Sequence, residues 1–310
     1  MSASLVFDHV SRWYGDTVAL GDVSFTLSPG ITGLLGHNGA GKTTALAICA
    51  GWAAPSQGTV RVLGRDPRRD PAVFGELGVV PDRDATWGFL TARATVEKLA
   101  SQRRVARPKQ AATAALARVG LTENADRRVG GFSQGMRQRV KLAQALAHDP
   151  QVLLLDEPLN GLDPAQRRHL VDLIVTLGAE GRTVLVSSHV LAEVERMADR
   201  VLVVVNGRLV AEGDPAGIRD LLTDRPRSLR IRTPRGRELA RRLLALPCVT
   251  SARVEADGLI LETSDARALA AALPGAAREA AATLRRVEPV GEDLESVFTY
   301  LTSAARGAAR

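Results

Sequence analysis

The sequence predicts an α/β domain built around a parallel sheet, followed by a small α+β domain. Apolar runs of strand length, "ITGLLG", "VLLLDEP" and "TVLVSSH", alternate with stretches of helical periodicity, an order typical of parallel sheets covered by helices. The pattern changes after the breaker-rich segment "GDPAGIRDLLTDRPRS", residues 213–228. We therefore expect residues 1–220 to form the larger domain and residues 221–310 the smaller one.

Length and composition indicate a globular protein without a membrane span. The chain has 310 residues, 45% of them apolar, which suffices for a substantial core. Its longest nearly unbroken apolar stretch, residues 45–54, is about half of the roughly 20 residues that cross a bilayer. The N-terminus lacks the features of a secretion signal, so we expect a cytoplasmic protein. Cys49 and Cys248 are far apart in sequence, which favours free thiols over a disulfide or a metal site.

The net charge of +7 lies mostly in the C-terminal part, because residues 225–310 carry 15 Arg, no Lys and 10 acidic residues. This basic run could contact phosphates of RNA or of anionic lipid. It lacks the interleaved aromatics of a base-stacking surface and alternates like an exposed strand and helix face, so we interpret it as solvated. Its members are Arg225, Arg227, Arg230, Arg232, Arg235, Arg237, Arg241 and Arg242. We expect no nucleic-acid partner.

Periodicity and breakers place the remaining elements. "LVFDHVSRWYG" and "VALGDVSFTLSPG" alternate as short strands, and residues 92–119 form a helical insert. Helices are expected near 164–178 and 190–198. The small domain is expected to contain strand 228–233, helix 235–246, strands 249–256 and 258–263, helix 265–273, strand 282–287 and helix 291–303. This βαββαβ order suggests a ferredoxin-like domain.

A phosphate-binding loop follows the first apolar run. In "GHNGAGKTT", residues 36–44, the glycines Gly36 and Gly41 let backbone N–H groups converge on phosphates. Lys42 brings positive charge to the β and γ oxygens, and the Thr43 hydroxyl suits Mg²⁺. The helix that begins here adds its positive N-terminal end. The other candidate nucleotide-binding positions are Gly39, Thr44 and the spacers His37, Asn38 and Ala40, which contribute mainly backbone.

Two further strand ends carry polar groups. "VLLLDEP" ends in Asp156 and Glu157, and "TVLVSSH" ends in His189. The carboxyl ends of parallel strands share one edge of a sheet, where ligands bind. Asp156 is therefore a candidate for the Mg²⁺ shell, Glu157 for the water that attacks the γ-phosphate, and His189 for a phosphate contact.

A second glycine-serine turn, "GGFSQGMRQR", precedes another helix, although one nucleotide needs only one cradle. The loop, "FSQGM", "LLLDEP", "NGLD" and "SSH" occur in an order and spacing that resemble the ATP-binding cassette (ABC) ATPases over roughly residues 4–215. This resemblance implies the cassette fold, with a parallel sheet core, an antiparallel β subdomain and a helical subdomain. It implies ATP and Mg²⁺ as ligands and a head-to-tail pairing with a second copy or a homologous cassette. Ser133, as helix N-cap, and Gly135 would then face the partner's γ-phosphate. Tyr14 would stack on adenine, and Asp163 would link the two sites.

The sequence departs from the family pattern in two places. Many cassettes read Leu-Ser-Gly-Gly-Gln where this chain has Phe-Ser-Gln-Gly-Met, which keeps the serine and the second glycine. Asp82 stands where most cassettes have a glutamine that touches Mg²⁺ and leads to the membrane partner. A carboxylate oxygen can serve Mg²⁺. The alternative is that Asp82 is a solvated loop residue and that Arg83 or Asp84 makes the coupling contact.

The ending "VEPVGEDLESVFTYLTSAARG", residues 287–307, resembles the single-cassette ATPases of ABC-2 type exporters, the group that includes drug and antibiotic efflux systems. The resemblance implies an ATPase subunit that drives separately encoded membrane permease subunits and lies at the inner face of the cell membrane through them. The alternatives are a soluble ribosome- or nucleic-acid-associated cassette and an importer ATPase. The cargo would be chosen by the membrane subunits and is not readable here.

Overall fold

The computed structural model of the protein describes residues 3–83, 86–218 and 227–290. The chain divides into two compact units, residues 1–215 and residues 216–310, and each is described by itself. The division expected between residues 220 and 221 lies in the segment 219–226, outside the described residues.

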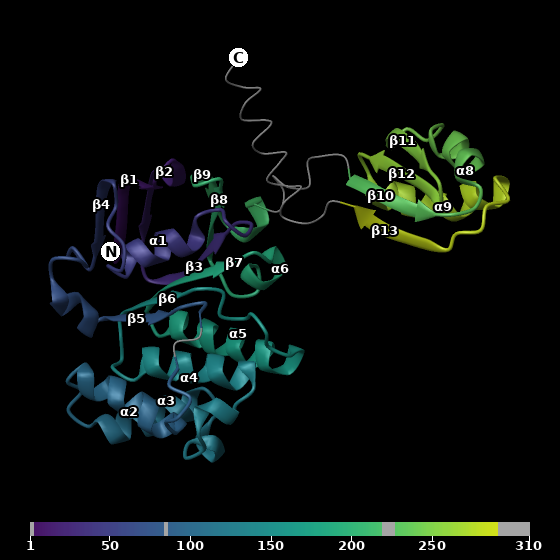
Figure 1. The fold of residues 1–310 in the computed structure, drawn as a ribbon. Helices are drawn as coiled ribbons and strands as arrows, with labels where there is room; N and C mark the ends of the chain where they lie inside the picture. The colour runs from purple at the N-terminus through teal and green to yellow at the C-terminus, as the bar shows by residue number, and fades with distance from the viewer. Residues whose placement is uncertain (1–2, 84–85, 219–226, 291–310) are drawn as a thin grey trace. The chain divides into compact units, whose positions relative to one another are not determined.

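A six-stranded sheet forms the centre of the first unit (Figure 1). Its order is β5-β6-β7-β3-β8-β9, and all neighbouring strands are parallel except the last pair. The apolar runs that predicted strands are buried throughout β6 and β7, because helices or a second sheet cover both faces. The strands are β3 (Gly30–Leu35), β5 (Leu77–Val80), β6 (Val152–Leu155), β7 (Thr183–Ser188), β8 (Arg200–Val205) and β9 (Arg208–Gly213).

A three-stranded antiparallel sheet and one helix cover the first face of the central sheet. The small sheet has the order β2-β1-β4, and its core includes a stacked pair of rings, Phe7 and Phe25. Alternate residues of the central strands, such as Leu34 and Leu154, belong to this core. The elements are β1 (Leu5–Tyr14), β2 (Thr17–Leu27), β4 (Gln57–Val62) and α1 (Lys42–Cys49).

Helices cover the other face, where residues such as Leu153 and Leu155 share a second core with them (Figure 1). The segment expected to be helical over 92–119 is two helices rather than one. Arg104, with φ 57°, ends the first, and Pro108 begins the second because proline suits the first turn of a helix. The helices are α2 (Ala92–Gln102), α3 (Pro108–Arg118), α4 (Gln134–Leu146) and α5 (Pro164–Ala179). The helix expected near 190–198 is only the short α6 (Leu191–Val194).

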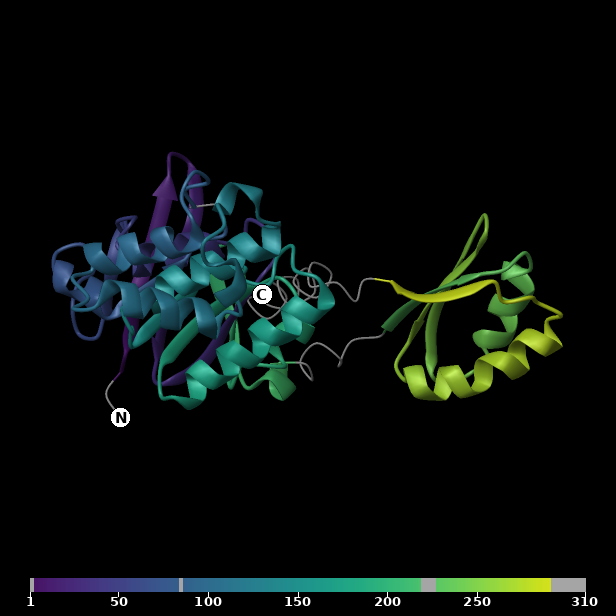
Figure 2. The same cartoon turned by 90° about the horizontal axis from the view of Figure 1, so that it is seen from below.

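The second unit has the predicted βαββαβ order along the chain and one antiparallel sheet, β11-β12-β10-β13 (Figure 2). Its core lies between this sheet and two helices. The elements are β10 (Arg227–Arg232), α8 (Gly236–Leu243), β11 (Val249–Glu255), β12 (Gly258–Thr263), α9 (Ala266–Glu279) and β13 (Arg286–Val290). Its assignment as ferredoxin-like remains a prediction.

Several boundaries expected in this unit are wrong: the helix expected over 235–246 ends at Leu243, and two other boundaries differ more. The alanine-rich helix continues past residue 273 through Pro274 to Glu279, because alanine favours helix on both sides of the proline. The last strand begins at Arg286 rather than residue 282, since its partner β10 ends at Arg232, which pairs with Arg286. The helix expected over 291–303 lies outside the described residues.

The arginine run in this unit is partly neutralised. Arg230 pairs with Glu255 at 3.4 Å, and Arg242 pairs with Glu279 at 3.5 Å. Arg232 lies within 3.3 Å of Asp257. These pairs within the unit are what a solvated, charged face requires.

Candidate functional site

The phosphate loop connects β3 to α1 as the sequence predicts. Gly36 cannot carry a side chain, because a Cβ there would lie 2.6 Å from the carbonyl oxygen of Val204. Gly41 has φ 108°, which only glycine adopts easily. Ala40 is buried, whereas Asn38, Gly39 and Thr43 are exposed. The loop therefore presents backbone and the first turn of α1 to solvent, as an anion cradle does.

Lys42 is folded back onto this loop. Its Nζ donates to the carbonyl oxygens of Gly36 at 2.6 Å and His37 at 3.3 Å. The same Nζ lies 3.2 Å from Glu157 Oε1, and the Lys42 side chain is only 5% exposed. A buried ammonium requires such compensation. The loop lysine and the carboxylate at the end of β6 are thus brought together by the fold.

The two neighbouring carboxylates are joined through Ser187 on β7. The Ser187 hydroxyl donates to Asp156 Oδ1 at 2.6 Å and accepts the N–H of Glu157 at 2.9 Å. Burial raises the pKa of Asp156, while hydrogen bonds from Ser187 and Thr43 lower it and the charges of Asp82 and Glu157 raise it further. The net pKa is raised, so the ionised form of Asp156 would gain from a nearby cation.

Glu157 is held in an unusual conformation between a lysine and a histidine. Its φ of 46° is in the left-handed region, which is costly for a residue with a side chain. Its Oε2 lies 3.0 Å from His189 Nδ1. Its Oε1 is buried and has an ion pair with Lys42 but no hydrogen-bond donor. His189 thus contacts Glu157 in this structure, and its predicted phosphate contact remains a prediction.

The fold also allows the predicted metal site. Asp156 and Thr43 offer the hard oxygen donors that Mg²⁺ prefers, and they are already linked by a hydrogen bond. Within residues 3–83, 86–218 and 227–290, no group of three His, Cys, Asp or Glu could hold a metal ion. The residues therefore fit an ion held by one carboxylate and one hydroxyl together with oxygens of a substrate.

Asp82 follows β5 and is exposed, but its charge reaches Asp156. Lys141 of α4 forms hydrogen bonds to the backbone here: its Nζ donates to the carbonyl of Asp82 at 3.1 Å and to that of Arg83 at 3.2 Å. Asp84, the other candidate for coupling, lies outside the described residues.

Ser133 is the N-cap of α4, where its hydroxyl accepts the N–H of Met136. Gly135 lies against the end of the Gln166 side chain, which would have to shift if a Cβ were present, because the two would be 2.0 Å apart. Gln134, one of the residues that depart from the family pattern, packs over Gly161 of the "NGLD" segment. The departure is thus accommodated by a neighbouring glycine within the same chain.

Tyr14 and Asp163 lie at the ends of their elements. Tyr14 ends β1, is 49% exposed, and has the guanidinium of Arg12 over its ring at 4.4 Å. Asp163 caps α5 by accepting the N–H groups of Ala165 and Gln166 at 2.9 Å each. The stacking and linking roles implied for them remain predictions.

Sequence reasoning missed Ser187 and Lys141. Ser187 was part of the quoted "SSH" ending, and a polar residue closing a buried strand beside two carboxylates is a usable signal. Lys141 gave no such signal, because a lysine within an amphipathic helix normally faces solvent, whereas this one is buried.

Comparisons with known proteins agree with this geometry. A protein-family model described as "ABC transporter" matches residues 20–160. "Nod factor export ATP-binding protein I" of Paraburkholderia xenovorans (strain LB400) is 40% identical over 226 residues, covering 70% of this chain and 72% of that protein. The protein of the same name from Burkholderia orbicola (strain AU 1054) is 40% identical and covers 69% and 71%.

Solved structures give the same result. The ATP binding subunit of an ABC transporter superposes with a TM-score of 0.65 and 27% identity, covering 71% of this chain and 92% of that one. cbiO1 from Clostridium perfringens, described as part of the ABC transporter complex cbiONQ, has a TM-score of 0.64 and 26% identity with the same coverage. No helix among the described residues is both long and apolar enough to cross a membrane. The chain therefore belongs to the ABC transporter family and is an ATP-binding cassette that hydrolyses ATP.

Proposed function

We propose that this cassette is the ATPase subunit of an exporter, in which two cassettes enclose two ATP molecules and drive separately encoded membrane subunits. The observation that carries the proposal is the convergence of Lys42, Asp156, Glu157 and His189 at the carboxyl ends of β3, β6 and β7. A phosphate cradle, a metal-binding carboxylate and a candidate base thus share one edge of the sheet.

The export assignment is supported by the relatives named for Nod factor export. The structural relative from Clostridium perfringens is itself part of a transporter complex. We place this chain in the cytoplasm, at the inner face of the membrane through its membrane subunits. The exporter-like ending, residues 287–307, lies mostly outside the described residues.

In the proposed mechanism the phosphates of ATP replace Glu157 as the anionic partner of Lys42. The Lys42 charge is now compensated by the loop carbonyls and by Glu157 Oε1 at 3.2 Å. Once a phosphate supplies that compensation, Glu157 is released to accept a proton from the attacking water. His189 orients the carboxylate through Oε2. Asp156 and Thr43 are the residues that would hold Mg²⁺, and a bound Mg²⁺ would supply positive charge near the phosphates.

The proposal of two cassettes rests on the serine turn and the phosphate loop leading into helices on opposite faces of the sheet. α1 shares a core with the antiparallel sheet, whereas α4, which begins after Ser133, belongs to the core of the opposite face. The hydroxyl and N–H groups at the start of α4 are oriented to receive an anion, and a head-to-tail partner supplies one. The partner is a second copy or a homologous cassette.

Glu157→Gln tests the site. The amide cannot accept the proton, so we expect turnover to fall by about 10²–10⁴, the usual contribution of a positioned base. ATP binding, measured by calorimetry, should be retained. Glu123→Gln, which changes an exposed glutamate in the helical region, is the matched control and should hydrolyse ATP like the wild type. Near-normal turnover in Glu157→Gln would reject the role of this residue.

A further inference from the structure

Helix α4, which follows the serine turn, holds the Asp82 loop directly through one buried lysine. Lys141 Nζ lies 2.7 Å from the carbonyl oxygen of Pro81, 3.1 Å from that of Asp82 and 3.2 Å from that of Arg83. The side chain is 5% exposed. An ammonium has only N–H donors and no acceptor, so the carbonyl oxygens of three successive loop residues are suitable partners for it.

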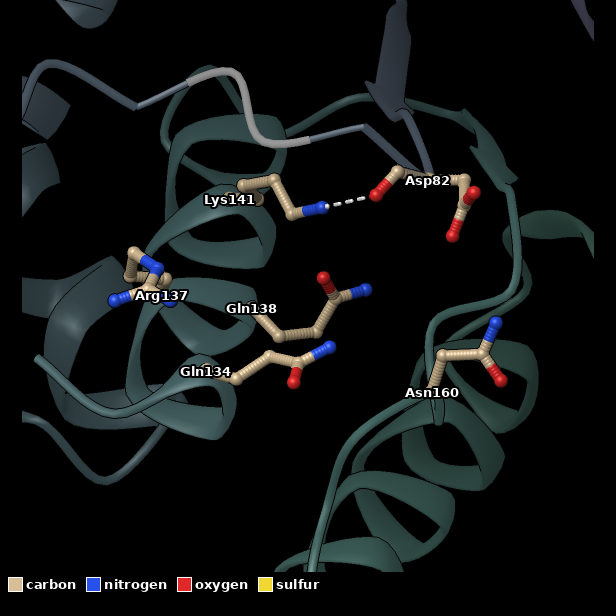
Figure 3. Close-up of a pocket in the computed structure, with 6 residues that line it drawn as sticks. All are labelled: Asp82, Gln134, Arg137, Gln138, Lys141 and Asn160. Carbon is tan, nitrogen blue, oxygen red and sulfur yellow. Dashed lines mark hydrogen bonds between the residues drawn. The ribbon is translucent and has the colours of Figure 1, made fainter.

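This arrangement fixes the backbone of Asp82 while leaving its carboxylate available. Figure 3 shows Lys141 reaching the Asp82 carbonyl, with the Asp82 carboxylate on the far side of the backbone. That carboxylate is close enough to Asp156 to disfavour the negative charge there. One face of the loop therefore belongs to α4, and the other faces the candidate metal site.

A second group on α4 points at the same place. Gln138, one turn before Lys141, is 7% exposed, and its Nε2 is buried without a hydrogen-bond partner among the described residues. Its amide is directed into a polar pocket of about 190 Å³ that Asp82 and Asn160 also line (Figure 3). An unpaired buried donor is costly, and a carboxylate that turned into this pocket would satisfy it. The helix thus offers a cation to the Asp82 backbone and an amide to its side chain.

We propose that Lys141 and Gln138 are positioning residues that couple the serine turn at the start of α4 to Asp82. Ser133 and Lys141 lie on one rigid helix, so a displacement of the Ser133 end by the partner's nucleotide moves the Asp82 loop with it. Lys141 determines the position of the backbone at residues 81–83. Gln138 holds the Asp82 side chain when it is withdrawn from Asp156. This inference rests on the proposed function, because it requires an ATP of the partner cassette at Ser133.

Lys141→Met tests the coupling, because it keeps the length of the side chain and removes its charge and donors. In the nucleotide-free protein, hydrogen exchange of the peptide over residues 77–83 should become severalfold faster, while exchange in β6 and β7 stays as in the wild type. ATP affinity should be unchanged, since Lys141 is outside the phosphate loop. The kcat for ATP should fall severalfold, and the Mg²⁺ concentration for half-maximal activity should rise. Lys109→Met, at an exposed position of α3, is the control and should change none of these.

Gln138→Leu completes the test, because it removes the amide and leaves the positive charge of Lys141 in place. It should leave loop exchange in the nucleotide-free protein unchanged and lower kcat. If Lys141→Met does not fold, Lys141→Gln, with fewer donors and no charge, should show the same direction at smaller size. Wild-type loop exchange or wild-type kcat in the lysine variants would overturn the proposal. A wild-type protein that does not hydrolyse ATP would instead reject the proposed function, and the exchange experiment would still report whether Lys141 holds the loop.

Discussion

Two adjacent residues at the end of β6 are held at a cost in stability. Asp156 is buried with a raised pKa, mainly because burial disfavours its charge. Glu157 has a left-handed backbone, with φ 46°. Sites of this kind trade stability for function. A cation bound beside Asp156 would offset the cost at that residue, because an opposite charge favours the ionised carboxylate.

Asp156→Asn should therefore stabilise the protein without nucleotide. A carboxyl whose folded pKa is raised contributes stability at low pH that is lost as the pH rises through that pKa, so at neutral pH its removal is a gain. We expect the melting temperature to rise by roughly 2–4 °C, which is the shift that a gain of about 1 kcal/mol in the free energy of unfolding causes in a domain of this size. Ser187 can still donate to the amide oxygen. At low pH, Asp156→Asn and the wild type should melt at the same temperature. If Asp156→Asn melted at or below the wild-type temperature at pH 7 as well, this account would be contradicted.

At the scale of elements, a half-buried histidine connects the turn after α4 to the first residue of β5. His148 Nε2 donates to the carbonyl of Leu77 at 3.1 Å, and its Nδ1 is buried with no hydrogen-bond partner in the described part of the chain. Burial lowers the pKa of His148 from 6.5, with Arg103 acting in the same direction and Asp149 and Glu76 opposing it. The neutral form of this ring is therefore favoured by the folded protein relative to the unfolded chain.

Its effect on stability has a definite sign. As the pH falls below 6.5, the unfolded chain takes up a proton that the folded chain refuses, so the free energy of unfolding falls until the folded pKa is reached. His148→Gln keeps a donor for Leu77 and removes this titration. Denaturant unfolding should show a shallower loss of stability between about pH 7 and about pH 5. His169→Gln, at an exposed position of α5, should leave the slope unchanged. Equal slopes for wild type and His148→Gln would remove His148 from the acid response.

Elements whose signal is local could be predicted from the sequence. Gly36, Lys42 and Asp156 follow buried apolar runs, and the fold brings their strand ends to one edge. The start of β13 could not be predicted, because pairing with Arg232 on β10 sets it. The grip of Lys141 on residues 81–83 spans about sixty positions and depends on tertiary packing. Long-range partners of this kind have no signature in composition or periodicity.

At the scale of the whole molecule, we propose that the first unit contributes half of two different sites. Its phosphate loop, Asp156 and Glu157 lie at one sheet edge, while Ser133 begins a helix on the opposite face of the sheet from α1. A single cassette arranged in this way has a phosphate cradle without an opposing serine turn. In the proposed head-to-tail dimer, each ATP would lie between Lys42 of one cassette and Ser133 of the other.

Mixed dimers test this arrangement, because it determines which pairs of substitutions fall in the same site. If one cassette carries Lys42→Ala and the other Ser133→Arg, both lesions fall in one composite site and the second site keeps both wild-type groups. Such a dimer, purified through two different tags, should hydrolyse ATP well above either variant homodimer. The reciprocal dimer joins a wild-type cassette to one that carries both changes, which places one lesion in each site, so its hydrolysis should be much lower. Ser133 is exposed, so arginine there should cost the fold little beyond the lost N-cap, about 1 kcal/mol. The opposite ranking of the two dimers would mean that Ser133 acts on the ATP of its own chain.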